Sequence, residues 1–356
     1  MPPIKKTVKK SPRRRSNAVT MHEVASYIGV SPMTVSRVLS GDAIVRTETR
    51  ERVQAAITEL GYSPNVAARN LAKASTIHIG LVYNNPSSVY LNELLVGVLE
   101  QSSHAGCQVV LEKCGSRGER AAITNLIKDD VNGIILPPPL SDSRAALETL
   151  RATKLPFIAV AGGRPEEKGI SVRINDFEAA AAMTRYLLSL GHRDLGFIVG
   201  APNQTASAQR YAGFVAALRS AGVKLHPEWV KQGFFSYRSG LLAAEQLLTT
   251  AERPSAIFAS NDDMAAATIA VAHRLQLEVP SELTIAGFDD TQLATTIWPT
   301  LTTVRQPIAA MARKAVELLL EEVRLRRHDQ TIAPLQLFLK FSLVKRKSSA
   351  IYQRTT

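Results

Sequence analysis

Short hydroxyl side chains and one guanidinium recur in the segment from Ser31 to Arg37. Ser31, Thr34, Ser36 and Arg37 occupy the side of this segment that its valines leave free. Hydroxyl groups suit phosphate oxygens, and an arginine can donate two hydrogen bonds to O6 and N7 of guanine. A merely solvated helix face would carry a mixture of glutamate and lysine instead. These residue types at this spacing predict contacts with nucleic acid.

Two short helices must position these side chains. Thr20 and Glu23 have the spacing of a capping box, so a first helix begins after Thr20 and ends at Gly29. Ser31 followed by Pro32 is an N-cap with proline at the first helical position, which predicts a second helix.

A third helix, over residues 47–60, places apolar side chains on one face at helical spacing. Two helices joined by a tight glycine turn and braced by a third form a helix-turn-helix, whose second helix lies in the major groove. Another three-helix bundle would have the same periodicity. The hydroxyls and the guanidinium favour the DNA-binding interpretation.

The basic charge is concentrated at the same end of the chain. Of a net charge of +12, residues 1–73 contribute +8, with 13 Lys and Arg against 5 Asp and Glu. Residues 1–17 contain seven basic side chains, three prolines and no acid, so we expect a disordered arm. An uneven basic charge of this kind is typical of a nucleic-acid-binding end.

No targeting or membrane segment is expected. The basic start of the chain is not followed by an apolar run, and no stretch reaches the ~18 apolar residues that a spanning helix needs. We therefore expect a cytoplasmic protein. Cys107 and Cys114 are spaced unlike zinc ligands and the seven histidines are scattered, so no cofactor and no metal are expected.

From residue 76 onward, eight short apolar runs alternate with helical patterns, as in residues 77–82, 195–200 and 283–289. Strands without internal alternation, each followed by a helix, predict parallel sheets covered on both faces. Eight such units are too many for one small sheet. We therefore expect two doubly wound subdomains, with ligands bound beyond the carboxyl ends of the strands.

Polar side chains follow three of these runs. Asn84 follows the first, Asn261 and Asp262 follow the seventh, and Asp289 and Asp290 follow the eighth. A polar residue at the end of a strand is often only the N-cap of the next helix, and we favour that interpretation for Asp262 and Asp290.

The chain resembles the lac repressor family of bacterial regulators. The resemblance is carried by VTMHEVASYIGVSPMTVSRVLSG and TRERVQAAITELGYSPNVAARNLA, and then by LGHRDLGFIVG, ASAQRYAGF, FASNDDMA, IAGFDDT, PTLTTVRQP and SLVKRK. It implies a repressor that binds a near-palindromic operator in double-stranded DNA as a homodimer. It also implies a small-molecule effector, for which carbohydrate is the expected class.

The implied fold class is α/β, in which a helix-turn-helix headpiece and a hinge helix precede a periplasmic-binding-protein-like body. That body consists of two doubly wound parallel-sheet subdomains with the cleft between them and three chain crossovers. The expected ranges are the arm 1–17, the helix-turn-helix 18–62, the hinge 63–75, the body 76–344 and a tail 345–356. Within the body we expect an N-subdomain of 76–175 plus 305–333 and a C-subdomain of 176–304 plus 334–344.

The resemblance also implies a hinge helix over residues 65–72 that docks in the minor groove. Eight residues are too few for a stable isolated helix, so it should fold only against DNA. Leu71 would be the wedge that unstacks the central base step. Pro32 and Met33 depart from relatives whose side chains hydrogen-bond to bases at these positions, and they can offer only apolar contacts. The expected DNA-binding residues are Thr20, Ser31, Pro32, Met33, Thr34, Ser36, Arg37, Asn65, Ala68 and Leu71.

For the effector, the resemblance places Asn261 and Asp289 on ligand hydroxyls, Arg210 as the effector-binding arginine and Phe235 against the apolar face of a sugar. Tyr90 either lines the same cleft or packs in the core. The alternative for Arg210 and Asp289 is a structural pair that joins two strand ends. The expected effector-binding residues are Asn84, Tyr90, Arg210, Phe235, Asn261 and Asp289.

Two positions depart from sugar-binding relatives. Ala161 stands where many of them have an aspartate, and their Asp-Asn pair is reversed to Asn175-Asp176. Two other classes of protein remain as alternatives. A transport-type sugar-binding protein would have no use for residues 20–72. A sugar-acting enzyme would use Asp289, Asp290, Asn261 and Asp262, although the chain contains none of the common hydrolase or nucleotide-binding motifs.

Overall fold

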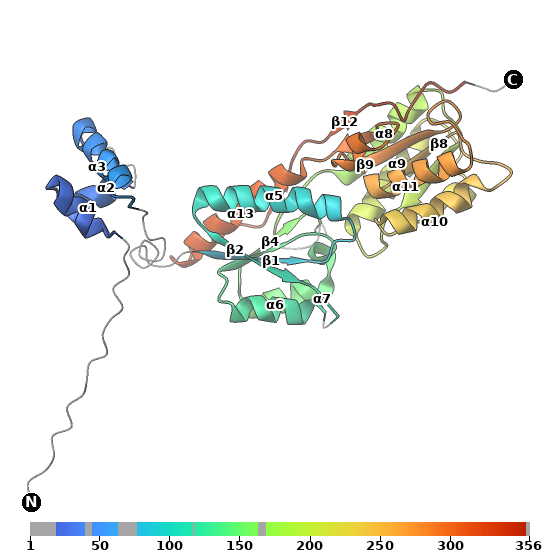
Figure 1. Ribbon diagram of the computed structural model, residues 1–356. Coiled ribbons are helices and arrows are strands. Elements are labelled where there is room, and N and C mark those ends of the chain that lie inside the picture. The colour runs from blue at the N-terminus through green and yellow to red at the C-terminus, as the bar shows by residue number, and fades with distance from the viewer. Residues whose placement is uncertain (1–18, 40–44, 63–76, 117, 163–168, 354–356) are drawn as a thin grey trace, which may run out of the picture. The chain divides into compact units, whose positions relative to one another are not determined.

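The computed structural model describes residues 19–39, 45–62, 77–116, 118–162 and 169–353 (Figure 1). The chain forms two units, Met1–Thr76 and Ile77–Thr356. The expected arm and hinge, with Asn65, Ala68 and Leu71, lie outside the described residues. No helix in the described part of the chain is long and apolar enough to cross a bilayer.

The first unit contains the three expected helices, α1 (Met21–Ile28), α2 (Pro32–Leu39) and α3 (Thr47–Glu59). The capping box is present, since the backbone N–H groups of Thr20 and Glu23 each donate to the other residue's side chain. Gly29 ends α1 in the left-handed conformation, at φ 69°. Val24, Val35 and Val53, one from each helix, are fully buried and form the core.

The first sheet of the second unit has the strand order β11-β5-β4-β3-β1-β2, and every pairing is parallel. One face carries α5 and α13, which pack against each other, and the other carries α6 and α7 (Figure 1). The strands are β1 (His78–Tyr83), β2 (Gln108–Lys113), β3 (Gly133–Leu136), β4 (Phe157–Val160), β5 (Ile170–Arg173) and β11 (Leu335–Phe338). The helices are α5 (Ser88–Ala105), α6 (Glu119–Lys128), η1 (Leu140–Asp142), α7 (Arg144–Thr153) and α13 (Ile308–Arg326).

The second sheet has the order β12-β10-β9-β8-β6-β7, with only β12 antiparallel to its neighbour in the described chain. Helices α8 and α9 form one packed pair and α10 and α11 another. The strands are β6 (Leu195–Val199), β7 (Val230–Gln232), β8 (Ala256–Ala259), β9 (Thr284–Asp289), β10 (Thr302–Arg305) and β12 (Ser342–Val344). The helices are α8 (Asp176–Ser189), α9 (Thr205–Ser220), η2 (Pro227–Trp229), α10 (Tyr237–Leu248), α11 (Asp262–Arg274) and α12 (Leu293–Thr296).

Two of the expected ranges were wrong. Residues 334–344 do not all belong to the C-subdomain, because β11 pairs with β5 at the edge of the first sheet before the chain crosses over. Residues 345–353 are not a separate tail. Ser348 accepts a hydrogen bond from the backbone of Ile285 and another from that of Thr302, which ties the segment to the second sheet.

A close approach between α8 and α9 sets the position of the residues that α9 presents. A Cβ atom built on Gly213 would lie 2.1 Å from the carbonyl oxygen of Phe177, far inside any real contact. Only glycine therefore allows α9 to lie this near to α8. Arg210, one turn earlier on α9, depends on that spacing.

We predict that Gly213→Ala lowers the stability of the body, although alanine is the better helix former by ~1 kcal/mol. The added methyl group must push backbone apart, and such overpacking costs about 1 to 3 kcal/mol. Thermal unfolding measures this loss. The control Ala212→Ser, at an exposed position of the same helix, should have little effect. Equal midpoints for wild type and Gly213→Ala would contradict the proposed constraint.

Candidate effector site and nucleic-acid interface

The exposed side of α2 carries the side chains expected to contact DNA. Val35 and Val38 face the core, while Met33 is 63% exposed and Ser36 and Arg37 are also exposed. Pro32 and Thr34 are half-buried. The structure thus presents Met33, Ser36 and Arg37 together on one helix of two turns.

Two of the expected contact groups also have a local role. The Ser31 hydroxyl accepts a hydrogen bond from the backbone of Thr34 at 3.1 Å and lies 2.9 Å from the Thr34 hydroxyl. Ser31 is therefore the N-cap of α2, as predicted. The same arrangement keeps both hydroxyls at the amino end of the helix, where backbone N–H groups favour anions.

Helix α3 holds α1 in place beside α2. The guanidinium of Arg52 donates to the carbonyl oxygen of Ile28 at 2.9 Å, and the Tyr27 hydroxyl donates to Glu59 at 2.8 Å. These contacts join the end of α1 to the middle and to the carboxyl end of α3. They brace the turn from which α2 emerges.

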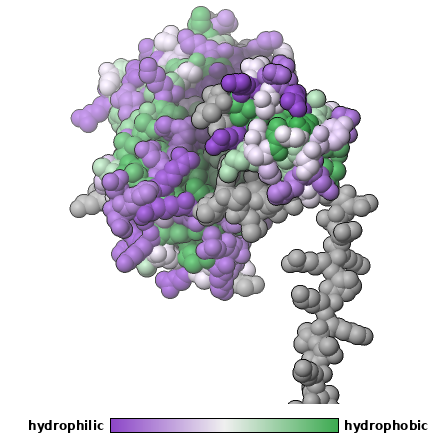
Figure 2. Space-filling model, turned by 90° about the vertical axis from the view of Figure 1, so that its left-hand side faces the viewer, coloured by the Kyte–Doolittle hydropathy of each residue, from purple (hydrophilic) through white to green (hydrophobic). Residues whose placement is uncertain are grey.

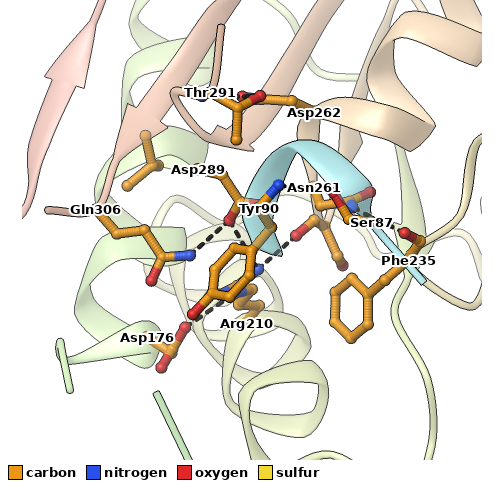
Figure 3. Close-up of polar contacts among 12 residues, drawn as sticks. Ser87, Tyr90, Asp176, Arg210, Phe235, Asn261, Asp262, Asp289, Thr291 and Gln306 are labelled. Carbon is orange, nitrogen blue, oxygen red and sulfur yellow. Dashed lines mark hydrogen bonds and ion pairs between the residues drawn. The ribbon is translucent and has the colours of Figure 1, made fainter. Parts of the chain in front are cut away.

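A cavity lies between the two subdomains of the body, near the carboxyl ends of β1, β4, β8 and β9. Its volume is about 30 Å³, room for one or two water molecules, so a sugar can enter only if the subdomains separate. Figure 3 shows the polar side chains that gather around it. The lining residues are Asn85, Pro86, Ser87, Tyr90, Pro138, Ala161, Gln204, Ala206, Arg210, Phe235, Asn261, Asp289 and Gln306.

Arg210 is the buried cation of this cavity and is held by several contacts. Its Nε donates to Asp176 at 2.8 Å and its Nη1 donates to the carbonyl oxygen of Ser260 at 2.6 Å. Its guanidinium carbon lies 3.6 Å from the centre of the Phe288 ring. Asp289 is farther away, with 3.7 Å between Nη1 and Oδ1. The closer ion pair is therefore with Asp176 and not with Asp289.

Asp289 is held at the end of β9 in an unusual backbone conformation. Its φ of 121° is rarely adopted by residues other than glycine, and its Oδ1 accepts a hydrogen bond from Gln306 at 2.6 Å. Ala161 and Phe235 also line the cavity with positive φ, at 52° and 58°. Such strain is often found at functional sites. Burial raises the pKa of Asp289 well above its ordinary value, and the charge of Arg210 opposes this shift.

The aromatic ring of Phe235 packs over a glycine. A Cβ atom at Gly200 would lie 2.0 Å from this ring, so the glycine after β6 is what makes room for it. The ring is buried and lines the cavity, as the resemblance implied.

Asn261 both lines the cavity and starts a helix. Its Oδ1 accepts a hydrogen bond from the backbone of Met264, which makes it the N-cap of α11, and its Nδ2 donates to the carbonyl oxygen of Phe235. The N-cap interpretation of Asp262 was therefore wrong by one residue.

Asp262 instead ties three segments together. Its carboxylate accepts hydrogen bonds from the backbone of Thr291 at 2.8 Å and from the Thr303 hydroxyl at 2.6 Å. Burial raises the pKa of Asp262 to about 7. Asp290 is also not an N-cap, because its buried carboxylate forms ion pairs with Arg305 and Arg346. Both aspartates stabilise the region around β9 and neither lines the cavity.

Tyr90 has both of the roles considered for it. Its ring packs in the core and lines the cavity, and its buried hydroxyl has no hydrogen-bond partner in the structure. Burial raises the pKa of this hydroxyl, so it remains protonated. Asn84 is exposed and lies outside the cavity, whereas the next residue, Asn85, lines it. Because β1 ends at Tyr83, the second residue after the strand, and not the first, reaches the cavity.

Besides Asn85, four polar residues at or beside the cavity were not predicted as site residues. Gln306 lies in the run PTLTTVRQP that carries the family resemblance, and Asp176 belongs to the reversed Asn175-Asp176 pair, so both had a signal in the sequence. Ser87 and Gln204 had none, since nothing in the sequence distinguishes them from ordinary loop residues. Their place depends on how the subdomains close on each other.

Two hydrogen-bonded contacts join the subdomains beside the cavity. The Ser87 hydroxyl donates to Asp263 at 2.6 Å. On the other side, the Asp142 carboxylate accepts from the backbone and the hydroxyl of Thr205, each at 2.9 Å. Gln204, the N-cap of α9, makes no side-chain capping bond, so Asp142 caps this helix from the opposite subdomain.

We predict that Asp142→Ala shifts the body toward an open cleft, because it removes the acceptor for Thr205. Fluorescent labels on the two subdomains should report a longer mean distance. Glu148→Ala removes an acid from an exposed ion pair of the same subdomain and serves as the control. An unchanged distance in Asp142→Ala would show that this contact does not hold the cleft closed.

The two carboxyl groups beside Arg210 should differ in how much they stabilise the ligand-free protein. Asp176→Ala should destabilise the ligand-free protein by about 3 to 5 kcal/mol, because it removes the close partner of a buried guanidinium. Asp289→Ala should cost less, since Arg210 keeps both of its hydrogen bonds. Chemical denaturation of the two variants tests this order, and a larger loss in Asp289→Ala would reverse the assignment.

Comparison with known proteins agrees with this architecture. Residues 20–65 match the model of bacterial regulatory proteins, lacI family, and residues 184–349 match a periplasmic binding protein-like domain. The HTH-type transcriptional repressor PurR of Pectobacterium carotovorum is 33% identical over 341 residues, which cover 93% of this chain and 97% of that protein.

Two solved structures are similar over nearly the whole chain. The lac repressor dimer bound to operator and the anti-inducer ONPF has a TM-score of 0.73 and 27% identity, and covers 94% of this chain and 100% of its own. The transcriptional regulator CelR in complex with cellobiose has a TM-score of 0.71 and 29% identity, over 93% and 100%. With its helix-turn-helix, its two-subdomain body and these relatives, the chain belongs to the lacI family of bacterial regulatory proteins and is a DNA-binding transcriptional repressor, not an enzyme.

Proposed function

We propose that this repressor controls genes for carbohydrate use and that a sugar-like effector binds in the cavity between its subdomains. The observation that carries the proposal is the convergence of Arg210, Asp289, Asn261 and Phe235 on that cavity. Donors, acceptors and an aromatic face together suit a ring with several hydroxyl groups. The similar regulator CelR was solved with cellobiose, which supports the same ligand class here.

On the DNA side, we propose that a dimer binds a near-palindromic operator, with α2 in the major groove of each half-site. Arg37 would donate to guanine, and the exposed Met33 would contact a thymine methyl group. Thr20, Ser31, Thr34 and Ser36 would bind phosphate oxygens, and Pro32 would add an apolar contact. The hinge residues Asn65, Ala68 and Leu71 would occupy the minor groove at the centre of the operator.

For the effector side we assign Arg210, Phe235, Asn261, Asp289 and Tyr90 to ligand contacts, and we replace Asn84 by Asn85. We infer how the effector acts from the size of the cavity. Because the closed cavity is too small for a sugar, binding requires the cleft to open and then close around the ligand. Such a ligand changes operator affinity only to the extent that it favours one arrangement of the subdomains.

The test begins with selection of the operator from random DNA by the purified full chain. Sugars are then added one at a time to the protein bound to that operator. The proposal requires a sequence-specific site with two related halves and at least one sugar that alters its occupancy. A selected site without two halves would contradict dimeric recognition by α2, and no response to any sugar would contradict the effector assignment.

We predict that Arg37→Ala weakens binding to the selected operator by ~1 to 3 kcal/mol and leaves nonspecific affinity nearly unchanged. A guanine contact depends on sequence, whereas a phosphate contact does not. The control Arg46→Ala removes the same charge from an exposed position outside α2. It should affect operator and random DNA alike. If Arg37→Ala also weakened both equally, Arg37 would be a phosphate contact.

A further inference from the structure

We propose that the cavity selects an uncharged polyhydroxyl ligand and rejects phosphorylated or carboxylated sugars. This inference rests on the proposed function, because it specifies the effector of the same site. The structural reason is that the buried cation of the cavity is already compensated by carboxylates of the protein itself.

Carboxyl groups of the protein surround the buried cation of the cavity. Arg210 is the only cation among the lining residues that the structure describes. The side chains of Asp176 and Asp289 are 11% and 4% exposed, and their nearest oxygens lie 2.8 and 3.7 Å from the guanidinium. Arg210 therefore already has two carboxyl groups of the protein as neighbours. A phosphate would compete with both of them for the guanidinium.

The hydrogen bonds that Arg210 already makes also limit its use in binding a phosphate. Two of its nitrogens are committed to Asp176 and to the carbonyl oxygen of Ser260, and its plane lies over the Phe288 ring. Bidentate recognition of a phosphate needs two parallel donors on one edge of the guanidinium. One edge of the guanidinium already donates to Asp176 and the other to the Ser260 carbonyl oxygen, so Arg210 would have to share or give up one of these contacts.

Two further carboxylates of the described residues lie beside the cavity. Asp142 and Asp263 hold the two contacts that join the subdomains there. An anion in the cavity would add a further negative charge to this group of carboxylates. Like charges at such short range disfavour binding because the buried site has a low effective dielectric constant.

The uncharged groups of the cavity, by contrast, have unused hydrogen-bonding capacity. The Tyr90 hydroxyl and the Gln306 Oε1 atom are buried and have no partner in the structure. Figure 3 shows both side chains beside Arg210 and Asp289. A ligand hydroxyl can donate to Gln306 and can either donate to or accept from Tyr90. Buried polar atoms without partners are rare in folded proteins, so these two point to a ligand with hydroxyl groups.

The experiment compares matched pairs of neutral and anionic sugars on the full-length protein. The probes are glucose with glucose 6-phosphate, ribose with ribose 5-phosphate, galactose with galacturonate, and cellobiose with cellobiose 6-phosphate. Isothermal titration measures affinity, and occupancy of the selected operator measures response. For any pair that binds, we expect the neutral member to bind at least tenfold more tightly.

The results expected if only the selectivity is wrong differ from those expected if the sugar-effector proposal is wrong. An anionic member that binds as tightly as its neutral partner, or more tightly, overturns the selectivity and leaves a sugar-type effector in place. If no member of any pair binds or alters operator occupancy, the sugar-effector proposal falls and the selectivity falls with it. A neutral sugar that binds and acts while its anionic partner does neither supports both.

One variant tests the cause of the selectivity. Asp176→Asn keeps an oxygen for the Arg210 Nε atom but removes the compensating charge. It should reduce the preference for the neutral member by about tenfold or more. Tyr90→Phe is the matched control, because it removes an unpaired hydroxyl at the same cavity and leaves the hydrogen bonds of Arg210 and Asp289 in place. It should weaken both members alike. An unaltered preference in folded Asp176→Asn would refute charge compensation as the cause, and the wild-type comparison decides the selectivity even if this variant does not fold.

Discussion

The burial of one positive charge, that of Arg210, constrains most of the body. A guanidinium removed from water needs carboxylates and carbonyl oxygens around it, and these come from different elements: Asp176 from the start of α8, Ser260 from the end of β8 and Asp289 from the end of β9. The glycine contact between α8 and α9 brings the arginine within reach of them. The same requirement shapes the ligand site, because Asp289, one of the neighbours of Arg210, also lines the cavity.

The region around β9 illustrates how a strained strand end is maintained. Asp289 and Asp290 both have positive φ, and each is held from outside its own strand. Gln306 binds the first, and Arg305 and Arg346 bind the second. Arg346 belongs to the segment after β12, so the last part of the described chain supports the cavity as well as the edge of the sheet. Strain of this kind persists only where surrounding contacts determine the conformation.

The two subdomains meet through few polar contacts around a cavity of about 30 Å³. Such an interface can open at modest cost, since its hydrogen bonds can be replaced by water. A ligand that fills the cavity and bridges both subdomains would add contacts available only in the closed arrangement. This is the physical basis on which an effector could change the affinity of a repressor for DNA.

Local signals in the sequence determined the headpiece and most of the body. The capping box at Thr20, the glycine at the end of α1 and the serine and proline before α2 specify helix ends through contacts a few residues apart, and the central strands are marked by their continuous apolar runs. The strands β7, β10, β11 and β12, with the sequences VKQ, TTVR, LQLF and SLV, are short and contain polar residues, so they lack the continuous apolar run by which the others were predicted. Their pairing, and the place of residues 345–353, was decided by neighbours far away in the chain.

The same holds for the cavity. Arg210, Asn261 and Asp289 could be predicted from strand ends and family resemblance, but the partnership of Arg210 with Asp176, the inclusion of Asn85 in place of Asn84 and the capping of α9 by Asp142 arise only when two subdomains and three crossovers are brought together in space.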